Sequence, residues 1–274
     1  FTYEISFKIP VICLGNIYIG GTGKTPLSIL IAEELIINKK KPAIIKKYYY
    51  NHSDEHNLIN AKLNCLFLNK KRTAALRDAI NKQCDFAILD DGFQDYSIKK
   101  DLNILCFNSE QLIGNGMTIP SGPLREKLNS IKKSDIVIIN GKKNQIFENK
   151  IKSISKKTKV LYSKYIPTNI KDFKNKNLLA FAGIGNPLNF FKLLTDNQLQ
   201  VKKKIEFPDH YEFEKMEIQK MIDLADKENL QIITTEKDYF RIKKFKFKDI
   251  NFLKIRLEIE KKNELINHIL NLKW

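Results

Sequence analysis

Short apolar runs alternate along the chain with longer stretches in which apolar residues recur at helical spacing. Continuous apolar runs between helices are typical of parallel strands covered on both faces. The pattern predicts strands over 9–14, 42–45, 65–68, 86–89, 103–107, 136–139, 178–182, 201–207, 231–234 and 251–256. It predicts helices over 23–38, 73–82, 187–195, 215–228 and 265–270. We therefore expect an α/β fold.

The stretch 165–177 is polar and lacks a period, so we predict a linker there. It divides the chain into a core over 1–168 and a smaller C-terminal α/β lobe over 169–274, with part of the C-terminus packing back on the core. A chain of 274 residues can bury a sizeable core without staples. Its four cysteines form no C-x-x-C pair, which argues against a disulfide framework or a zinc site.

The glycine-rich segment GGTGKT at 20–25 follows a predicted strand and opens a predicted helix, the context that a phosphate-binding loop requires. Glycines let backbone amides converge on phosphate oxygens, and the helix N-terminus adds unpaired donors. Lys24 can reach the β- and γ-phosphates, and the Thr25 hydroxyl can bind Mg²⁺. A glycine-rich turn without a ligand is the less favoured alternative. The predicted nucleotide-binding residues are Tyr18, Ile19, Gly20, Gly21, Thr22, Gly23, Lys24 and Thr25.

A second motif supplies carboxylates. The apolar run 86–89 ends on Asp90 and Asp91, as in the Walker-B pattern that holds a metal ion. The carboxyl ends of parallel strands are where open α/β sheets bind ligands. Taken alone, the two acids could simply cap a turn; together with the phosphate loop they predict a Mg²⁺–ATP site. This reasoning does not separate a kinase from an NTPase switch.

Charge adds little to this picture. Lys+Arg number 48 against 31 Asp+Glu, which gives a formal net charge of +17. Lysines occur in nearly every segment, so a scattered solvated surface is favoured over a patch for an anionic partner. No nucleic-acid recognition motif is visible, and we expect no nucleic-acid partner. A basic NTPase associated with nucleic acid remains one of the alternatives.

Further blocks follow in series: GNIYIGGTGKTP at 15–26, DDGFQ at 90–94, GNG at 114–116, PSGPLRE at 120–126, FAGIGNP at 181–187, FPDHY at 207–211 and TTEKD at 234–238. In these blocks the chain resembles the tetraacyldisaccharide 4'-kinases, the lipid A kinases of Gram-negative bacteria. The phosphate-loop consensus has a glycine where this chain has Tyr18. Members of that family also lack this first glycine, so Tyr18 agrees with the resemblance. The resemblance covers the chain from about residue 10 to 240.

The resemblance implies a P-loop core, a smaller C-terminal lobe and a two-stranded link. It implies transfer of the γ-phosphate of ATP, with Mg²⁺, to the 4'-hydroxyl of a tetraacylated glucosamine disaccharide 1-phosphate, which gives lipid IV-A. The enzyme would be a peripheral protein at the cytoplasmic face of the bacterial inner membrane, in contact with its anionic surface. The family's usual N-terminal anchor is missing from this chain, and we expect a monomer.

The resemblance also assigns roles to individual residues. It places the catalytic carboxylate at Asp54, which would orient or deprotonate the sugar hydroxyl. Glu55 would be a further metal ligand, and His210 would tune Asp54. Lys24 would be catalytic, and Asp90 and Asp91 would hold metal. The expected substrate or phosphate contacts are Gln94, Arg72, Arg125 and Glu126.

The sequence departs from the family pattern in three places. Residues 46–50 read KKYYY where the family usually has SRGYG, and the loop from there to Asp54 is short. Asp95 stands where a histidine is common.

One alternative from another class is a P-loop ATPase switch of the partition or metal-insertion kind. It predicts hydrolysis without a lipid acceptor and nucleotide-dependent dimerisation. The blocks DDGFQ, GPLRE and FPDHY belong neither to this alternative nor to the nucleic-acid one. The segment PLNFFKLL at 187–194 could meet a membrane, but an amphipathic helix packed on the core is favoured.

Overall fold

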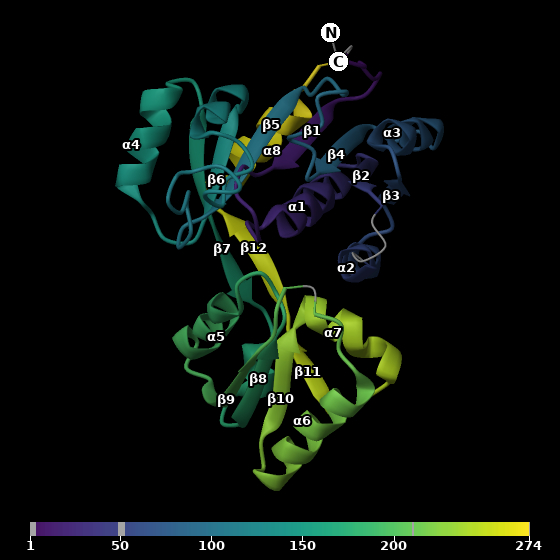
Figure 1. Ribbon diagram of the computed structural model, residues 1–274. Coiled ribbons are helices and arrows are strands. Elements are labelled where there is room, and N and C mark those ends of the chain that lie inside the picture. The colour runs from purple at the N-terminus through teal and green to yellow at the C-terminus, as the bar shows by residue number, and fades with distance from the viewer. Residues whose placement is uncertain (1–3, 49–52, 210, 274) are drawn as a thin grey trace. The chain divides into compact units, whose positions relative to one another are not determined.

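A computed structural model describes residues 4–48, 53–209 and 211–273, with the side chains of 53–55 left out of the description. The chain separates into two compact units. The first comprises Phe1–Tyr49, Ile59–Tyr165 and Leu257–Trp274, and the second comprises Tyr50–Leu58 and Ile166–Arg256. Both units are α/β, which confirms the predicted fold class (Figure 1).

The first unit is built on an eight-stranded sheet in the order β12-β7-β6-β5-β1-β4-β2-β3. Its strands are β1 Val11–Gly15, β2 Pro42–Lys47, β3 Leu66–Asn69, β4 Phe86–Asp90, β5 Leu102–Asn108, β6 Ile136–Asn140, β7 Lys159–Pro167 and β12 Ile255–Ile259. Its helices are α1 Lys24–Ile37, α3 Arg72–Asn81, α4 Gln145–Ile154 and α8 Lys262–Leu270. Helix α2, Ser53–Lys62, crosses the boundary between the units.

Strand β1 lies at the point where the strand order of this sheet reverses. It pairs in parallel with β4 on one side and with β5 on the other, with Leu14 opposite Asp90 and Gly15 opposite Leu105. In open α/β sheets, ligands bind at the carboxyl ends of the strands beside such a switch point. The loop after β1 and the turn after β4 therefore share the edge where a ligand site is expected.

Helices cover both faces of this sheet because its strands are apolar on both sides. One core cluster joins alternate residues of β1, β2 and β4, such as Val11, Ile45 and Leu89, to Leu76 of α3. A second joins Phe107 and Ile139 to Phe147 and Ile151 of α4. The residues between them point to the opposite face, where α1 packs on β1, β2 and β4 and contacts α8 (Figure 1).

The second unit contains a four-stranded parallel sheet in the order β11-β10-β8-β9. The strands are β8 Asn177–Ala182, β9 Gln200–Glu206, β10 Gln231–Thr235 and β11 Ile250–Leu253; the helices are α5 Pro187–Asp196, α6 Lys215–Lys227 and α7 Glu236–Ile242. Helix α5 buries Phe190, Phe191 and Leu194 against one face of the sheet, as the sequence predicted for a core helix. Helix α6 covers the other face.

Three features of the chain differ from the sequence-based expectations. The single strand expected at 251–256 is wrong: the region forms two strands, β11 in the second sheet and β12 in the first. Residues 165–177, where we predicted a linker, hold the end of β7 and a 3-10 helix, Ile170–Phe173. Strand β7 and helices α2, α4 and α7 were not predicted.

Candidate active site

The loop between β1 and α1 is shaped by glycines and by one buried side chain. Gly20 and Gly23 have φ values of 118° and 89°, which favour glycine. A Cβ at Gly20 or Gly21 would meet nothing within 4 Å, so the loop faces open space there. Asn16 is fully buried, and its Nδ2 donates to Thr22 Oγ1 at 3.1 Å and to the Gly20 carbonyl at 3.3 Å. These contacts fix the backbone of the loop around Gly20 and Thr22.

The DDGFQ turn packs directly against the end of β1. Asp91 has a left-handed backbone, with φ of 60°, which sharply turns the chain after β4. A Cβ placed on Gly15 would lie only 2.2 Å from Phe93 Cβ. The close approach explains why glycine is needed at position 15, and it brings the two motifs within reach of each other.

Asp90 is the buried acid of the site. Its Oδ2 accepts a hydrogen bond from Thr25 Oγ1 at 3.0 Å and forms an ion pair with Lys46 Nζ at 2.7 Å. The Asp90 and Lys46 side chains are only 1% and 8% exposed. Asp90 Oδ1 is buried and has no hydrogen-bond partner among the described residues. This orphaned oxygen beside the Thr25 hydroxyl is available to a cation.

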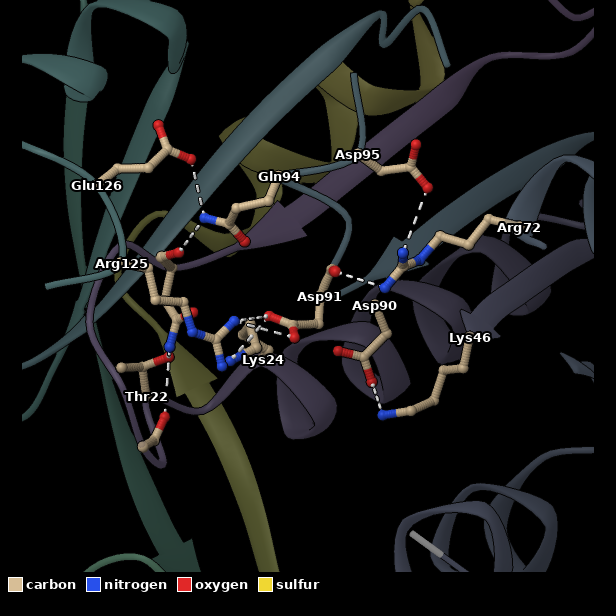
Figure 2. Close-up of polar contacts among 12 residues, drawn as sticks. Thr22, Lys24, Lys46, Arg72, Asp90, Asp91, Gln94, Asp95, Arg125 and Glu126 are labelled. Carbon is tan, nitrogen blue, oxygen red and sulfur yellow. Dashed lines mark hydrogen bonds and ion pairs between the residues drawn. The ribbon is translucent and has the colours of Figure 1, made fainter. Parts of the chain in front are cut away.

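Asp91 faces the lysine of the glycine-rich loop. Lys24 Nζ lies 3.3 Å from Asp91 Oδ1, and Arg125 Nη1 lies 3.2 Å from both carboxylate oxygens (Figure 2). Burial would raise the pKa of Asp91, but the two cations outweigh it and lower the pKa. Asp91 is therefore ionised at neutral pH and brings Lys24 and Arg125 together at the mouth of the loop.

Arg72 of α3 braces the other side of the turn. Its Nη2 donates to the Asp91 carbonyl at 2.6 Å, and its Nη1 lies 3.3 Å from Asp95 Oδ2. Burial of Asp95 acts to raise its pKa, yet hydrogen bonds from Ser97 and the charge of Arg72 lower it. The described contacts of Arg72 are thus with Asp91 and Asp95, which hold the turn in place.

Gln94 and Glu126 connect the turn to the phosphate loop. Gln94 Nε2 donates to the Asn16 carbonyl and to Glu126 Oε1, both at 3.0 Å. Glu126 also lies 3.9 Å from the Lys133 ammonium. Figure 2 shows Gln94 between Glu126 and the loop.

The segment that carries GPLRE runs beside the phosphate loop. Arg125 N donates to the Ile17 carbonyl at 2.7 Å, and Ile19 N donates to the Pro123 carbonyl at 2.9 Å. Tyr18 and Leu124 form an isolated antiparallel bridge. This pairing explains how a residue a hundred positions away from Lys24 reaches the same carboxylate.

Three residues that the resemblance placed at the site cannot be located there. Asp54 and Glu55 belong to helix α2, in the segment grouped with the second unit, and their side chains are outside the description. His210 lies outside the described residues. Their roles stay predictions.

Two residues at the site were missed from the sequence. Asn16 is a polar residue directly after a buried strand, and Lys46 occupies an inward position of β2. In the strand PAIIKK, period-2 alternation puts Lys46 on the same face as Ile44, so a buried charge could have been predicted.

A divalent cation would fit this site. Mg²⁺ uses one or two carboxylates together with substrate phosphates and water. Thr25 Oγ1 and Asp90 Oδ1 are suitable oxygen ligands, and Asp91 is the next acid along. Among the described side chains (residues 4–48, 56–209 and 211–273), no three His, Cys, Asp or Glu form a metal-binding group.

A separate polar cluster joins two of the sequence blocks in the second unit. Asp238 is fully buried; its Oδ2 accepts from the Gly183 amide at 3.0 Å and from Thr235 Oγ1 at 2.7 Å. Arg241 bonds both Asp238 Oδ1 and the Gly183 carbonyl. Burial raises the pKa of Asp238. These contacts fasten the FAGIGNP turn to the start of α7.

Comparison with known proteins agrees with this geometry. The profile of the family described as Tetraacyldisaccharide-1-P 4'-kinase matches residues 1–273. A relative named tetraacyldisaccharide 4'-kinase from Pelagibacter ubique is 44% identical over 268 residues, which cover 97% of this chain and 85% of the relative. One of the same name from Brucella ovis is 32% identical over 86% of this chain and 74% of its own length.

Among solved structures, LpxK from Aquifex aeolicus in complex with ATP has a similar fold. Its TM-score is 0.76 at 22% identity, and the match covers 99% of this chain and 91% of that one.

None of the helices in the described part of the chain is both long and apolar enough to span a membrane.

Proposed function

Because the chain belongs to the family of tetraacyldisaccharide-1-P 4'-kinases, we propose that it transfers the γ-phosphate of ATP to the 4'-hydroxyl of a tetraacylated glucosamine disaccharide 1-phosphate. The product would be lipid IV-A. The observation that carries the proposal is the match to this family over residues 1–273. The arrangement of Lys24, Thr25 and the two acids of DDGFQ at the switch point of the sheet supports the nucleotide site that such a kinase needs. A partition-type ATPase switch has no such support from the relatives.

ATP binding follows from the shape and charge of the loop. The amides of residues 20–24 would surround the phosphates, and Lys24 would neutralise the β- and γ-phosphates. Lys24 and Arg125 both contact Asp91 in the structure. Since a triphosphate carries more negative charge than one carboxylate, both cations would move from Asp91 to the phosphates when ATP binds.

We propose that Mg²⁺ is held by Thr25, Asp90 and Asp91, with Glu55 as a further ligand. The ion would neutralise charge that develops on the transferred phosphoryl group. Gln94 and Glu126 would fix the position of the DDGFQ turn relative to the phosphate loop. Arg72 and Arg125 would help to bind phosphate groups.

A sugar hydroxyl is a weak nucleophile, so its proton must be accepted as the bond to phosphorus forms. We propose Asp54 for this role, with His210 tuning its basicity. The support is the resemblance in sequence around both residues. The same resemblance supports a peripheral monomer at the cytoplasmic face of the inner membrane, on an anionic lipid surface, without nucleic acid.

The decisive test is incubation of the purified chain with ATP, Mg²⁺ and the disaccharide 1-phosphate lipid in mixed micelles. We expect a lipid product that is heavier by one phosphate and labelled at the 4'-position. Lipid-independent ATP hydrolysis without a phosphorylated lipid would instead support the ATPase switch. A Lys24→Ala protein serves as the blank, because contaminating kinases would survive in that sample.

A further inference from the structure

Lys46 is a buried cation bonded to the acid that is expected to hold the metal. Its ammonium lies 2.7 Å from Asp90 Oδ2, the oxygen that also accepts from Thr25. Figure 2 shows Lys46 reaching Asp90 from β2, while Lys24 and Arg125 meet at Asp91. Lys46 thus adds a cation at the buried acid itself, separate from the two that are free to follow the phosphates.

The described acids of the DDGFQ turn, and Asp95 after it, each form an ion pair with a basic side chain. Asp91 is paired with Lys24 and Arg125, and Asp95 with Arg72. Asp90 is paired with Lys46. A free divalent ion would therefore gain little from these carboxylates, and at Asp90 it would also be repelled by an ammonium on the same group.

We propose that Lys46 makes divalent-metal binding depend on nucleotide. In the nucleotide-free protein its charge keeps free Mg²⁺ away from Asp90. When ATP binds, its phosphates supply the negative charge and the remaining oxygen ligands that the ion needs, so they offset the repulsion between Lys46 and the ion. Lys46 acts through Asp90 and is a positioning residue, and the metal would reach the orphaned Asp90 Oδ1 together with the phosphates.

The size of the effect follows from charge alone. A unit charge and a divalent ion about 4–5 Å apart repel each other by enough to lower affinity more than roughly tenfold, even with the dielectric constant of bulk water. Burial of Lys46 can only increase that repulsion, because screening is weaker away from solvent.

The test is titration of the nucleotide-free full chain with Mn²⁺, with the free ion followed by electron paramagnetic resonance. Lys46→Gln removes the charge but keeps a donor for Asp90, and we expect it to bind Mn²⁺ at least about tenfold more tightly than the wild type. Lys46→Arg keeps the charge and should match the wild type. With saturating ADP, the gap between Lys46→Gln and the wild type should shrink.

Lys47→Gln is the matched control, since Lys47 is the exposed neighbour at the end of the same strand. Equal Mn²⁺ affinity in Lys46→Gln and the wild type would overturn the proposal. An equal gain in Lys47→Gln would overturn it too, because net charge alone would then explain the result. Lys46→Met is the second neutral variant. If neither Lys46→Gln nor Lys46→Met folds, Lys46 is required for the fold, and this result would count against the proposal.

This inference rests on the proposed Mg²⁺–ATP site, but its test uses no lipid. A chain that fails to phosphorylate the lipid while Lys46→Gln gains Mn²⁺ affinity would leave the metal inference standing and refute the proposed function. The reverse pair of results would refute only the inference.

Discussion

Substitution of Gly15 by alanine tests the contact that joins the two halves of the site. The added Cβ would lie 2.2 Å from Phe93 Cβ, far below the 3.0 Å that real Cβ contacts respect. The end of β1 and the DDGFQ turn would have to separate by roughly 0.8 Å or more, in a core with little free volume. Phe93 is 2% exposed, so its ring has no open space to enter.

We expect this overpacking to cost about 1–3 kcal/mol of unfolding free energy. At about 2–4 °C per kcal/mol for a domain of this size, the melting temperature of the nucleotide-free protein should fall by several degrees. Separation of the turn from the loop should also weaken ATP binding, because Asp91 and Lys24 would lose their shared geometry. Differential scanning fluorimetry and ATP titration measure the two effects.

Gly21→Ala is the matched control in the same loop. A Cβ there meets nothing within 4 Å, so the fold should tolerate alanine. Its melting temperature should equal the wild type or rise slightly, because alanine lowers the entropy of the unfolded chain. If Gly15→Ala melted within about 1 °C of the wild type, well inside the shift expected per kcal/mol, the close approach to Phe93 would be refuted as a constraint.

Three further predictions concern single side chains. Lys24→Ala should lower the rate of phosphate transfer by about 10²–10³-fold, the cost of one charge-stabilising donor, in a steady-state kinase assay; a near-normal rate would exclude the phosphate loop. Asp54→Ala should lower kcat by about 10²–10⁴-fold while ATP still binds, and a smaller loss would exclude Asp54 as the base. Asp95→Asn should reduce stability at neutral pH, because the lowered pKa of Asp95 means that its ionised form favours the fold. The stabilisation is present above the unfolded pKa of about 3.9 and disappears as pH falls through the lower folded pKa, so urea midpoints of the two proteins should converge in acid; a pH-independent gap would contradict this.

Much of the nucleotide site could be predicted from local sequence. Glycines, a lysine and a threonine after an apolar run define a loop whose geometry is set by neighbours in the chain. The same holds for Asp90 at the end of β4. The partners of these residues could not be predicted in the same way, because Arg125 reaches Asp91 through a bridge between distant segments.

Some helices and strands could not be predicted correctly from the sequence, for physical reasons. The stretch 250–259 (INFLKIRLEI) keeps a strand-like alternation of apolar and polar residues and contains no glycine or proline, so nothing local shows that one part pairs in one sheet and the next part in another. Helix α4 was missed although Phe147 and Ile151 stand four residues apart and are buried, a spacing that indicates a helical face. Because lysines occur in nearly every segment, composition gives Lys46 no distinct signal, and only its inward position in β2 marks it.

The path of the C-terminus has a consequence for biosynthesis. The last strand and helix, β12 and α8, return to the first unit, where Leu265, Ile266 and Ile269 are buried and Lys262 pairs with Glu34 of α1. On the ribosome, the first unit cannot complete its sheet until residues 255–259 have emerged. A truncation at residue 168 would therefore leave α1 partly uncovered and aggregation-prone, rather than release an autonomous nucleotide-binding domain.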